Sequence, residues 1–207
     1  MRKYHQSIDD KIFRSIRART NASVFLIKDF SEFGKKPAVG QALARLVKAG
    51  TLRRVRQGLY DLPRSHPLIG QTAPDPSAMV QALMKDNGAV WQFTGAYAAN
   101  LLGLSDQVPA QIVVQTAGAS RRVALGNLTI VFRHAAPRNL FGAGRPAGLV
   151  IQALRHLRKI GMSATTLDRL RHQLDAATKA DLKALVSSLP GWMQPLVAQI
   201  IAAPDSR

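Results

Sequence analysis

The chain has 207 residues, no cysteine, and a formal charge of +17 from 29 Lys+Arg against 12 Asp+Glu. A hydrophobic fraction of 46% with 20% charged residues is typical of globular proteins and excludes a chain that is disordered throughout. Because cysteine is absent, disulfides, thiol catalysis and cysteine-bound zinc are excluded, and the composition fits a reducing cytoplasm. The excess of positive charge predicts a surface that binds nucleic acid.

The sequence offers no membrane segment. Its beginning lacks the apolar core of a signal peptide. The two longest uncharged stretches, residues 87–105 and 184–204, are interrupted by Asn, Gln, Ser, Gly and Pro, so neither is expected to span a bilayer. We therefore expect a cytoplasmic protein without a membrane partner.

Positive charge is concentrated near the start of the chain. Residues 1–66 contain 15 Lys+Arg and five Asp+Glu, whereas residues 67–207 contain 14 and seven. The change coincides with residues 63–76, where four prolines forbid a continuous helix or central strand. We predict an N-terminal domain over residues 1–66, a linker over residues 67–74 and a second domain over residues 75–207.

Local signals predict the elements of the N-terminal domain. Ser7 followed by Asp10 is typical of a capped helix start, and Pro37 suits the first turn of a later helix. Gly34 tolerates the left-handed conformation that ends a helix, and β-prone runs on both sides of residues 56–58 predict a hairpin. In chain order the expected elements are a helix over 8–19, a strand over 24–27, a short helix over 28–33, a helix over 37–49 and a hairpin over 52–62.

This order is that of a winged helix-turn-helix, in which the third helix enters the DNA major groove and the hairpin, or wing, touches the adjacent backbone. Arg45 can pair with guanine through two hydrogen bonds, and Gln41 can do the same with adenine. The surrounding cations would mostly meet phosphates, which gives affinity but little sequence information. The predicted DNA-binding set is completed by Lys35, Lys36, Lys48, Arg53, Arg54, Arg56 and Gln57.

A solvated helix face and an ordinary surface hairpin would produce the same pattern, since runs of charge are common on wet surfaces. We favour DNA because three arginines close together in one hairpin repel one another unless an anion is near.

The second domain is predicted to be α+β, with a small sheet followed by helices. Helices are expected from Pro76 and over residues 94–102, and a strand over residues 89–93. Gly126-Asn127 between β-prone runs predicts a two-residue hairpin, preceded by a strand over residues 111–115. Helical periodicity then continues from Gly148 to the end of the chain, with Thr178 and Asp181 at the spacing of a capping box.

The second domain shows little catalytic chemistry. The glycine-rich residues 142–148 lack the Lys-Ser/Thr of a phosphate-binding P-loop, so we interpret them as a loop. The five histidines show no short metal-ligand spacing, and Glu32 is the chain's one glutamate. We expect no catalysis, no cofactor and no bound metal.

A second basic cluster stands in the strands and the loop that follows them. It could bind nucleic acid, bind an acidic partner or be solvated, and the sequence leaves these three alternatives open. Its members are Arg121, Arg122, Arg133 and Arg138.

Several stretches resemble the AbiEi-like antitoxins. In the N-terminal domain these are residues 34–60, with Ala42–Val47 and Gly50–Leu52 inside them; in the second domain they are Thr94–Ser105, Thr129–Arg133 and Gly148–Leu154. The resemblance covers most of residues 8–160, and beyond them only the helical character is similar.

Proteins of that family are antitoxins of type IV toxin–antitoxin systems and are linked to abortive phage infection. The resemblance implies a winged helix that binds inverted repeats in the operon's own promoter and represses it. It also implies a C-terminal domain that counteracts a nucleotidyltransferase toxin encoded next door. The toxin itself would need an Asp-x-Asp pair to hold metal, and the chain contains none. Its adjacent Asp9-Asp10 suits the positive end of a helix dipole instead.

Two other functions stay open. The first is a stand-alone winged-helix transcriptional regulator whose second domain senses a ligand or oligomerises. The second is a nucleic-acid-modifying enzyme, for which the sequence offers no candidate catalytic residues. A nucleotidyltransferase-like neighbouring gene would favour the antitoxin.

Overall fold

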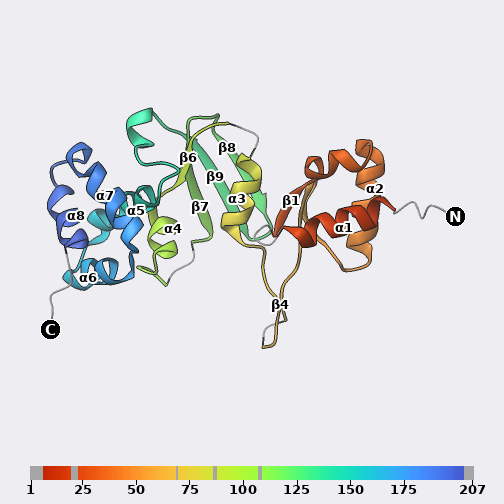
Figure 1. Ribbon diagram of the computed structural model, residues 1–207, viewed down its shortest axis with the longest axis horizontal. Coiled ribbons are helices and arrows are strands. Elements are labelled where there is room, and N and C mark those ends of the chain that lie inside the picture. Colours follow the sequence, from red (N-terminus) through yellow and green to blue (C-terminus); the bar gives the residue numbers. More distant parts are fainter. Residues whose placement is uncertain (1–6, 20–22, 69, 86–87, 107–108, 203–207) are drawn as a thin grey trace. The chain divides into compact units, whose positions relative to one another are not determined.

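The protein has an α+β fold, as the sequence predicts, built from two compact units, Met1–Gly88 and Ala89–Arg207 (Figure 1). The computed structural model describes residues 7–19, 23–68, 70–85, 88–106 and 109–202.

The first unit begins with a winged helix-turn-helix. Its sheet has the order β1-β3-β2, and both pairings are antiparallel. The elements run in the order α1 (Ile8–Ala18), β1 (Val24–Leu26), the 3₁₀ helix η1 (Ile27–Phe33), α2 (Lys36–Lys48), β2 (Arg53–Arg56) and β3 (Leu59–Asp61).

Local chemistry and one apolar core account for these elements. The Ser7 hydroxyl accepts a hydrogen bond from the Asp10 N–H, and the Asp10 carboxylate accepts one from the Ser7 N–H, so the predicted capping box is present. The apolar faces of the helices then meet the inner side of the sheet in a common core. Its fully buried members include Ile12, Ile16, Phe25, Phe30, Val39, Ala42 and Leu43.

Gly34 serves a different purpose from the predicted one. Its φ of 160° is extended backbone rather than a left-handed helix stop. A Cβ at this position would lie 3.2 Å from the Cδ1 of Ile8. Close packing against α1, rather than backbone conformation, is therefore what the residue provides.

The predicted linker lies within the first unit. After β3 the chain forms a two-stranded hairpin, β4 (Ser65–His66) and β5 (Gly70–Gln71), which we call the arm; Figure 1 shows it projecting from the unit. Helix α3 (Pro76–Met84) follows and packs against β1. Prolines stop a helix but permit a hairpin, so part of the arm can lie within residues 67–74, where a free linker was predicted. Because α3 buries its apolar face against β1, it belongs to the first unit, and the units divide after Gly88.

The second unit combines a four-stranded sheet with a helical layer. The sheet has the order β6-β7-β9-β8, with β7 and β9 parallel and the other pairs antiparallel. The strands are β6 (Trp91–Phe93), β7 (Gln111–Thr116), β8 (Arg121–Leu125) and β9 (Leu128–His134). The helices are α4 (Gly95–Leu101), η2 (Pro137–Asn139), α5 (Pro146–Ile160), α6 (Ala164–Gln173), α7 (Ala176–Leu185), η3 (Val186–Ser188) and α8 (Gln194–Ile201).

The predicted hairpin at Gly126-Asn127 is confirmed. Strands β8 and β9 pair from Leu125 opposite Leu128, and Gly126 has the positive φ of 63° that such a tight turn requires.

The expected capping box at Thr178 is wrong, because α7 already begins at Ala176 and its N-cap residue is Asp175, three residues before Thr178. The Asp175 carboxylate accepts a hydrogen bond of 2.7 Å from the Thr178 N–H and thereby caps the helix. Asp181 instead reaches the start of α5, where it pairs with Arg145 and accepts a hydrogen bond from the Ala147 N–H. A carboxylate from α7 thus satisfies the N-terminus of α5.

The glycine-rich residues 142–148 are a packing contact. A Cβ on Gly148, in the first turn of α5, would lie 2.0 Å from the carbonyl oxygen of Gly142. Gly142 itself has a φ of 79°. Two glycines therefore let the chain fold back on the start of α5, and the loop predicted here is a turn that packs against that helix.

Candidate nucleic-acid interface

Helix α2 separates an apolar face from a polar one. Val39 and Leu43 are buried in the core of the first unit, whereas Gln41, Arg45 and Lys48 are exposed. These three lie four and three residues apart, which places them along one side of the helix. The surface that a winged helix presents to a major groove therefore carries the predicted base-reading residues.

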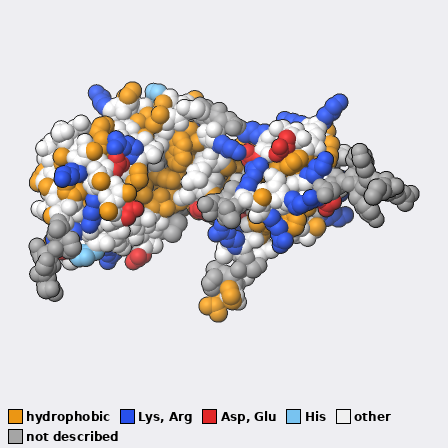
Figure 2. Space-filling model, viewed as in Figure 1, with side chains coloured by type: hydrophobic (Ala, Val, Ile, Leu, Met, Phe, Trp, Pro, Cys, Tyr) orange, Lys and Arg blue, Asp and Glu red, His pale blue; other side chains and the backbone are white. Residues whose placement is uncertain are grey.

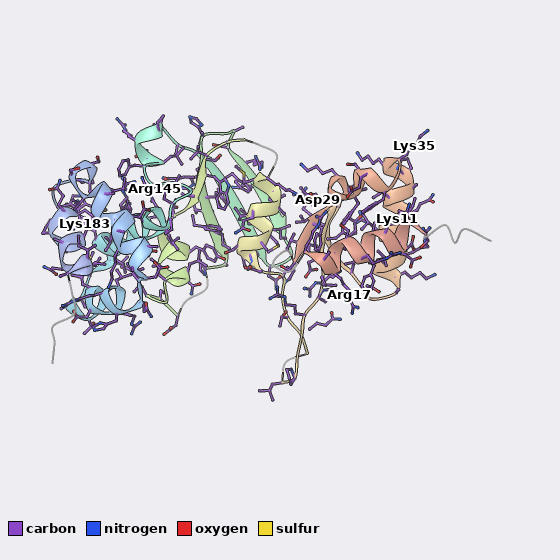
Figure 3. The ribbon with its side chains drawn as sticks, in the orientation of Figure 1. Lys11, Arg17, Asp29, Lys35, Arg145 and Lys183 are labelled. Carbon is purple, nitrogen blue, oxygen red and sulfur yellow. The ribbon has the colours of Figure 1, made fainter. Side chains whose placement is uncertain are left out.

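Two lysines stand at the start of α2. Lys35 is the N-cap residue and Lys36 the first helical residue, and both are exposed. Figure 3 labels Lys35, whose side chain projects outward. The first turn of α2 carries no acidic residue. The positive end of the helix dipole is therefore not offset by a carboxylate of α2 itself.

The wing is the hairpin of β2 and β3. Arg54, Arg56 and Gln57 are exposed along β2 and at the turn, where Gly58 adopts a φ of 80°. The pairing shifts register between Arg54 and Arg56, so the strand contains a β-bulge. The turn is anchored, because the Ile27 N–H donates a hydrogen bond of 3.1 Å to the Gly58 carbonyl oxygen.

A pocket of about 460 Å³ lies between η1, the start of α2 and the tip of the wing. Its apolar lining includes Ile27 and Val39, while Lys28, Lys36 and Gln57 contribute polar groups. The tip of the wing and the start of α2 therefore line one concave surface.

Arg45 is held in place by a carboxylate from another helix. Its Nε and Nη2 donate hydrogen bonds of 2.8 and 2.6 Å to the two oxygens of Asp9, in the first turn of α1. The hydrogen bond from Arg45 is the main reason that the pKa of Asp9 lies below its ordinary value. From the sequence, Asp9 was expected only to complement a helix dipole. The structure adds it to the candidate interface as the partner of Arg45.

Arg53 does not fit the phosphate contact predicted for it. Its Nε and Nη2 donate hydrogen bonds of 2.9 and 2.6 Å to Asp61 on β3, and Nη2 also donates one of 2.8 Å to the Thr72 carbonyl oxygen. The Asp61 side chain is only 3% exposed and that of Arg53 is 30% exposed. Because Asp61 precedes the arm and Thr72 follows it, the guanidinium fastens both ends of the arm.

Asp29 forms a further ion pair within the first unit. It accepts a hydrogen bond from the Leu26 N–H and pairs with Lys85 at 2.7 Å (Figure 3 labels Asp29). Figure 2 shows that Lys and Arg side chains dominate the charged groups on the viewed face of this unit. Asp9, Asp29 and Asp61 each pair with a Lys or Arg of the same unit, so their negative charge is balanced locally.

The second basic cluster is split by the alternation of side chains along a strand. Arg121 lies opposite Phe132, and its guanidinium stacks 4.2 Å from the centre of that ring. Arg122 lies opposite Val131, so it shares the other face of the sheet with Arg133. Arg122 and Arg133 are exposed, and Arg138 is exposed separately in η2.

Among the described residues, no three His, Asp or Glu side chains gather closely enough to hold a metal ion. Within the same part of the chain, no helix is both long and apolar enough to cross a membrane.

Comparison with known proteins gives a family and a similar structure. A family model described as a family of unknown function, DUF6088, matches residues 11–182, and so reaches from α1 to α7 across both units. The crystal structure of the RV2827C protein from Mycobacterium tuberculosis is similar, with a TM-score of 0.45 and 19% sequence identity, over 93% of this chain and 77% of that chain. No curated protein matches the sequence.

Proposed function

The chain belongs to the DUF6088 family, and we propose that it is a DNA-binding antitoxin that represses its own promoter and counteracts a nucleotidyltransferase toxin. The proposal has two parts with different support. Double-stranded DNA binding rests on the geometry of the first unit. The antitoxin role, of the type IV and abortive-infection class, rests on the sequence resemblance to the AbiEi-like proteins.

The observation that carries DNA binding is the exposed row Gln41, Arg45 and Lys48 on the third helix of a winged helix-turn-helix. Arg54 and Arg56 extend positive charge along the wing. A planar guanidinium and an amide suit base edges, and the remaining cations suit phosphates. Arg53 is left out of this set because its guanidinium bonds both to the buried Asp61 carboxylate and to the Thr72 carbonyl oxygen.

The test uses the full chain and a duplex from immediately upstream of its own operon. We expect binding that exceeds binding to a scrambled duplex of the same composition. Affinity should also fall steeply between 50 and 200 mM salt, because bound cations release counterions from the DNA. A folded protein that binds neither duplex at low salt would overturn the proposal.

The antitoxin role is tested by growth. Co-expression of the chain with the neighbouring gene should restore growth that the neighbouring gene alone suppresses. Residues 89–207, checked for folding by circular dichroism, should also restore growth without repressing the promoter, because compact units commonly keep separable activities. Rescue by residues 1–88 with none from residues 89–207 would contradict this division.

The second candidate function is a stand-alone transcriptional regulator whose second unit senses a ligand or oligomerises. The same geometry of α2 and the wing supports it. It would be favoured if the promoter is repressed but no neighbouring gene is toxic. In both cases we propose a binding protein rather than an enzyme, with no cofactor. The sequence contains no Asp-x-Asp pair that could hold a catalytic metal, and it has a single glutamate.

A further inference from the structure

The strongest unexplained feature of the first unit is the ion pair between Arg45 and Asp9. It joins residues 36 positions apart, from the exposed side of α2 to the first turn of α1. The two side chains stay accessible, at 58% and 23% exposure, so the pair is not a buried structural bridge. An exposed ion pair contributes little to stability. Stability therefore does not explain why the two side chains are held in this two-bond arrangement.

The carboxylate occupies only one edge of the guanidinium. Asp9 accepts from Nε and from one hydrogen of Nη2. An arginine carries five N–H donors in a planar fork, so both hydrogens of Nη1 and the second hydrogen of Nη2 remain. Those donors form the end of the fork, which is the edge that pairs with O6 and N7 of guanine.

Asp9 is itself well placed to hold this orientation. The helix that carries it is capped by Ser7 and Asp10 and is fixed in the core by Ile12 and Ile16. An arginine side chain that is already oriented loses less conformational entropy when it binds. A carboxylate near DNA also repels phosphates, so its presence beside a base-reading residue favours specificity at some expense of affinity.

We infer that Asp9 is a specificity-determining residue, which orients the guanidinium of Arg45 so that its free edge reads one guanine in the major groove. This inference rests on the proposed DNA binding. Asp9 acts through Arg45 and is therefore a positioning residue, whereas Arg45 makes the base contact.

The experiment selects bound duplexes from a library with a randomised central segment, using the full-length chain and its variants. The wild-type chain should enrich a motif that contains a guanine, and Arg45→Ala should lose the preference at that position. Asp9→Asn and Asp9→Glu should lose the same preference. The second variant keeps the charge but, being one methylene longer, loses the fit to Nε and Nη2.

Asp10→Asn is the matched control. It removes the same charge from the same helical turn, but Asp10 bonds to Ser7 and not to Arg45. Its motif should be that of the wild-type chain, and all variants should unfold cooperatively with wild-type helix content. If Asp9→Asn is poorly folded, Asp9→Glu alone decides the outcome.

A chemical replacement of the base then tests the contact directly. Replacing the selected guanine by 7-deazaguanine removes the N7 acceptor and should weaken wild-type binding about tenfold. Binding by Asp9→Glu should change by less than about twofold, since the oriented contact is already lost. Retention of the guanine preference and of the 7-deazaguanine effect in both Asp9 variants would overturn the inference. If the wild-type chain enriches no motif at all, the proposed DNA binding fails, and this inference fails with it.

Discussion

The two basic clusters of this chain look similar in sequence and differ in three dimensions. In the first unit, Arg54 and Arg56 stand exposed on a wing next to the polar side of α2. In the second unit, Arg121 is stacked on Phe132, while Arg122 points from the opposite face of the sheet. Adjacent arginines on a strand therefore do not make one patch, because alternate side chains leave opposite faces.

The same lesson applies within the first unit. Arg53 and Arg54 are neighbours on β2, but only Arg53 is paired with a buried carboxylate. Net charge counts both residues equally, whereas the structure assigns one to holding the arm and the other to the surface. The useful comparison is therefore between cations that pair with a buried carboxylate and cations that stay exposed.

The largest effect should separate Arg53 from Arg54. Arg53→Ala leaves the buried Asp61 carboxylate without its main partner, and we expect a loss of about 2–3 kcal/mol in the free energy of unfolding. Arg54→Ala, the matched control, should change it by less than about 0.5 kcal/mol. Urea unfolding followed by circular dichroism measures both. Equal, small effects would show that Arg53 is merely another surface cation.

The next effect should separate the wing from the second cluster. Arg54→Ala with Arg56→Ala should weaken binding to the operator duplex and to a scrambled duplex about equally. The slope of log affinity against log salt should become shallower by about two units, roughly one for each lost phosphate contact. Arg122→Ala with Arg133→Ala removes the same charge and should leave that slope unchanged. A change of slope in the second pair would mean that both units contact DNA.

The smallest effect concerns pH and the pair of Asp9 with Arg45. The hydrogen bond from Arg45 lowers the pKa of Asp9 in the folded chain below its ordinary value of 3.8. The folded state therefore binds this proton less tightly than the unfolded state does. The stabilisation is complete above pH 3.8 and is lost as pH falls through the lower folded pKa. The difference in urea midpoint between the wild-type chain and Asp9→Asn should shrink only in that acidic range; a change near neutral pH would point to another group.

Much of the fold follows from local signals in the sequence. The capping box at Ser7, the turn at Gly126 and the order of elements in the winged helix were all predictable, because each depends on residues a few positions apart. The boundary between the two units was not predictable in this way, because it depends on the packing of α3 against β1, which are distant in the chain. The positions of base-reading candidates on α2 followed from helix periodicity.

The pairings that refine the site were beyond such reasoning. Arg45 and Asp9 are 36 positions apart, and nothing in either local sequence indicates the other. Arg53 and Asp61 are closer, eight positions apart, and the register of a hairpin could have suggested them. A rule that checks each cation of a predicted hairpin for a carboxylate opposite it would have found that pair.

The contact between Gly142 and Gly148 has a consequence for how this family is interpreted from variation alone. With 2.0 Å between the carbonyl oxygen and any added Cβ, even alanine at position 148 forces the backbones apart. A substitution scan scored on fitness would record an intolerant glycine opening a helix after a glycine-rich loop, the signature usually credited to nucleotide binding. Here that intolerance would report a steric constraint between two backbone segments, and it would not by itself indicate a bound nucleotide.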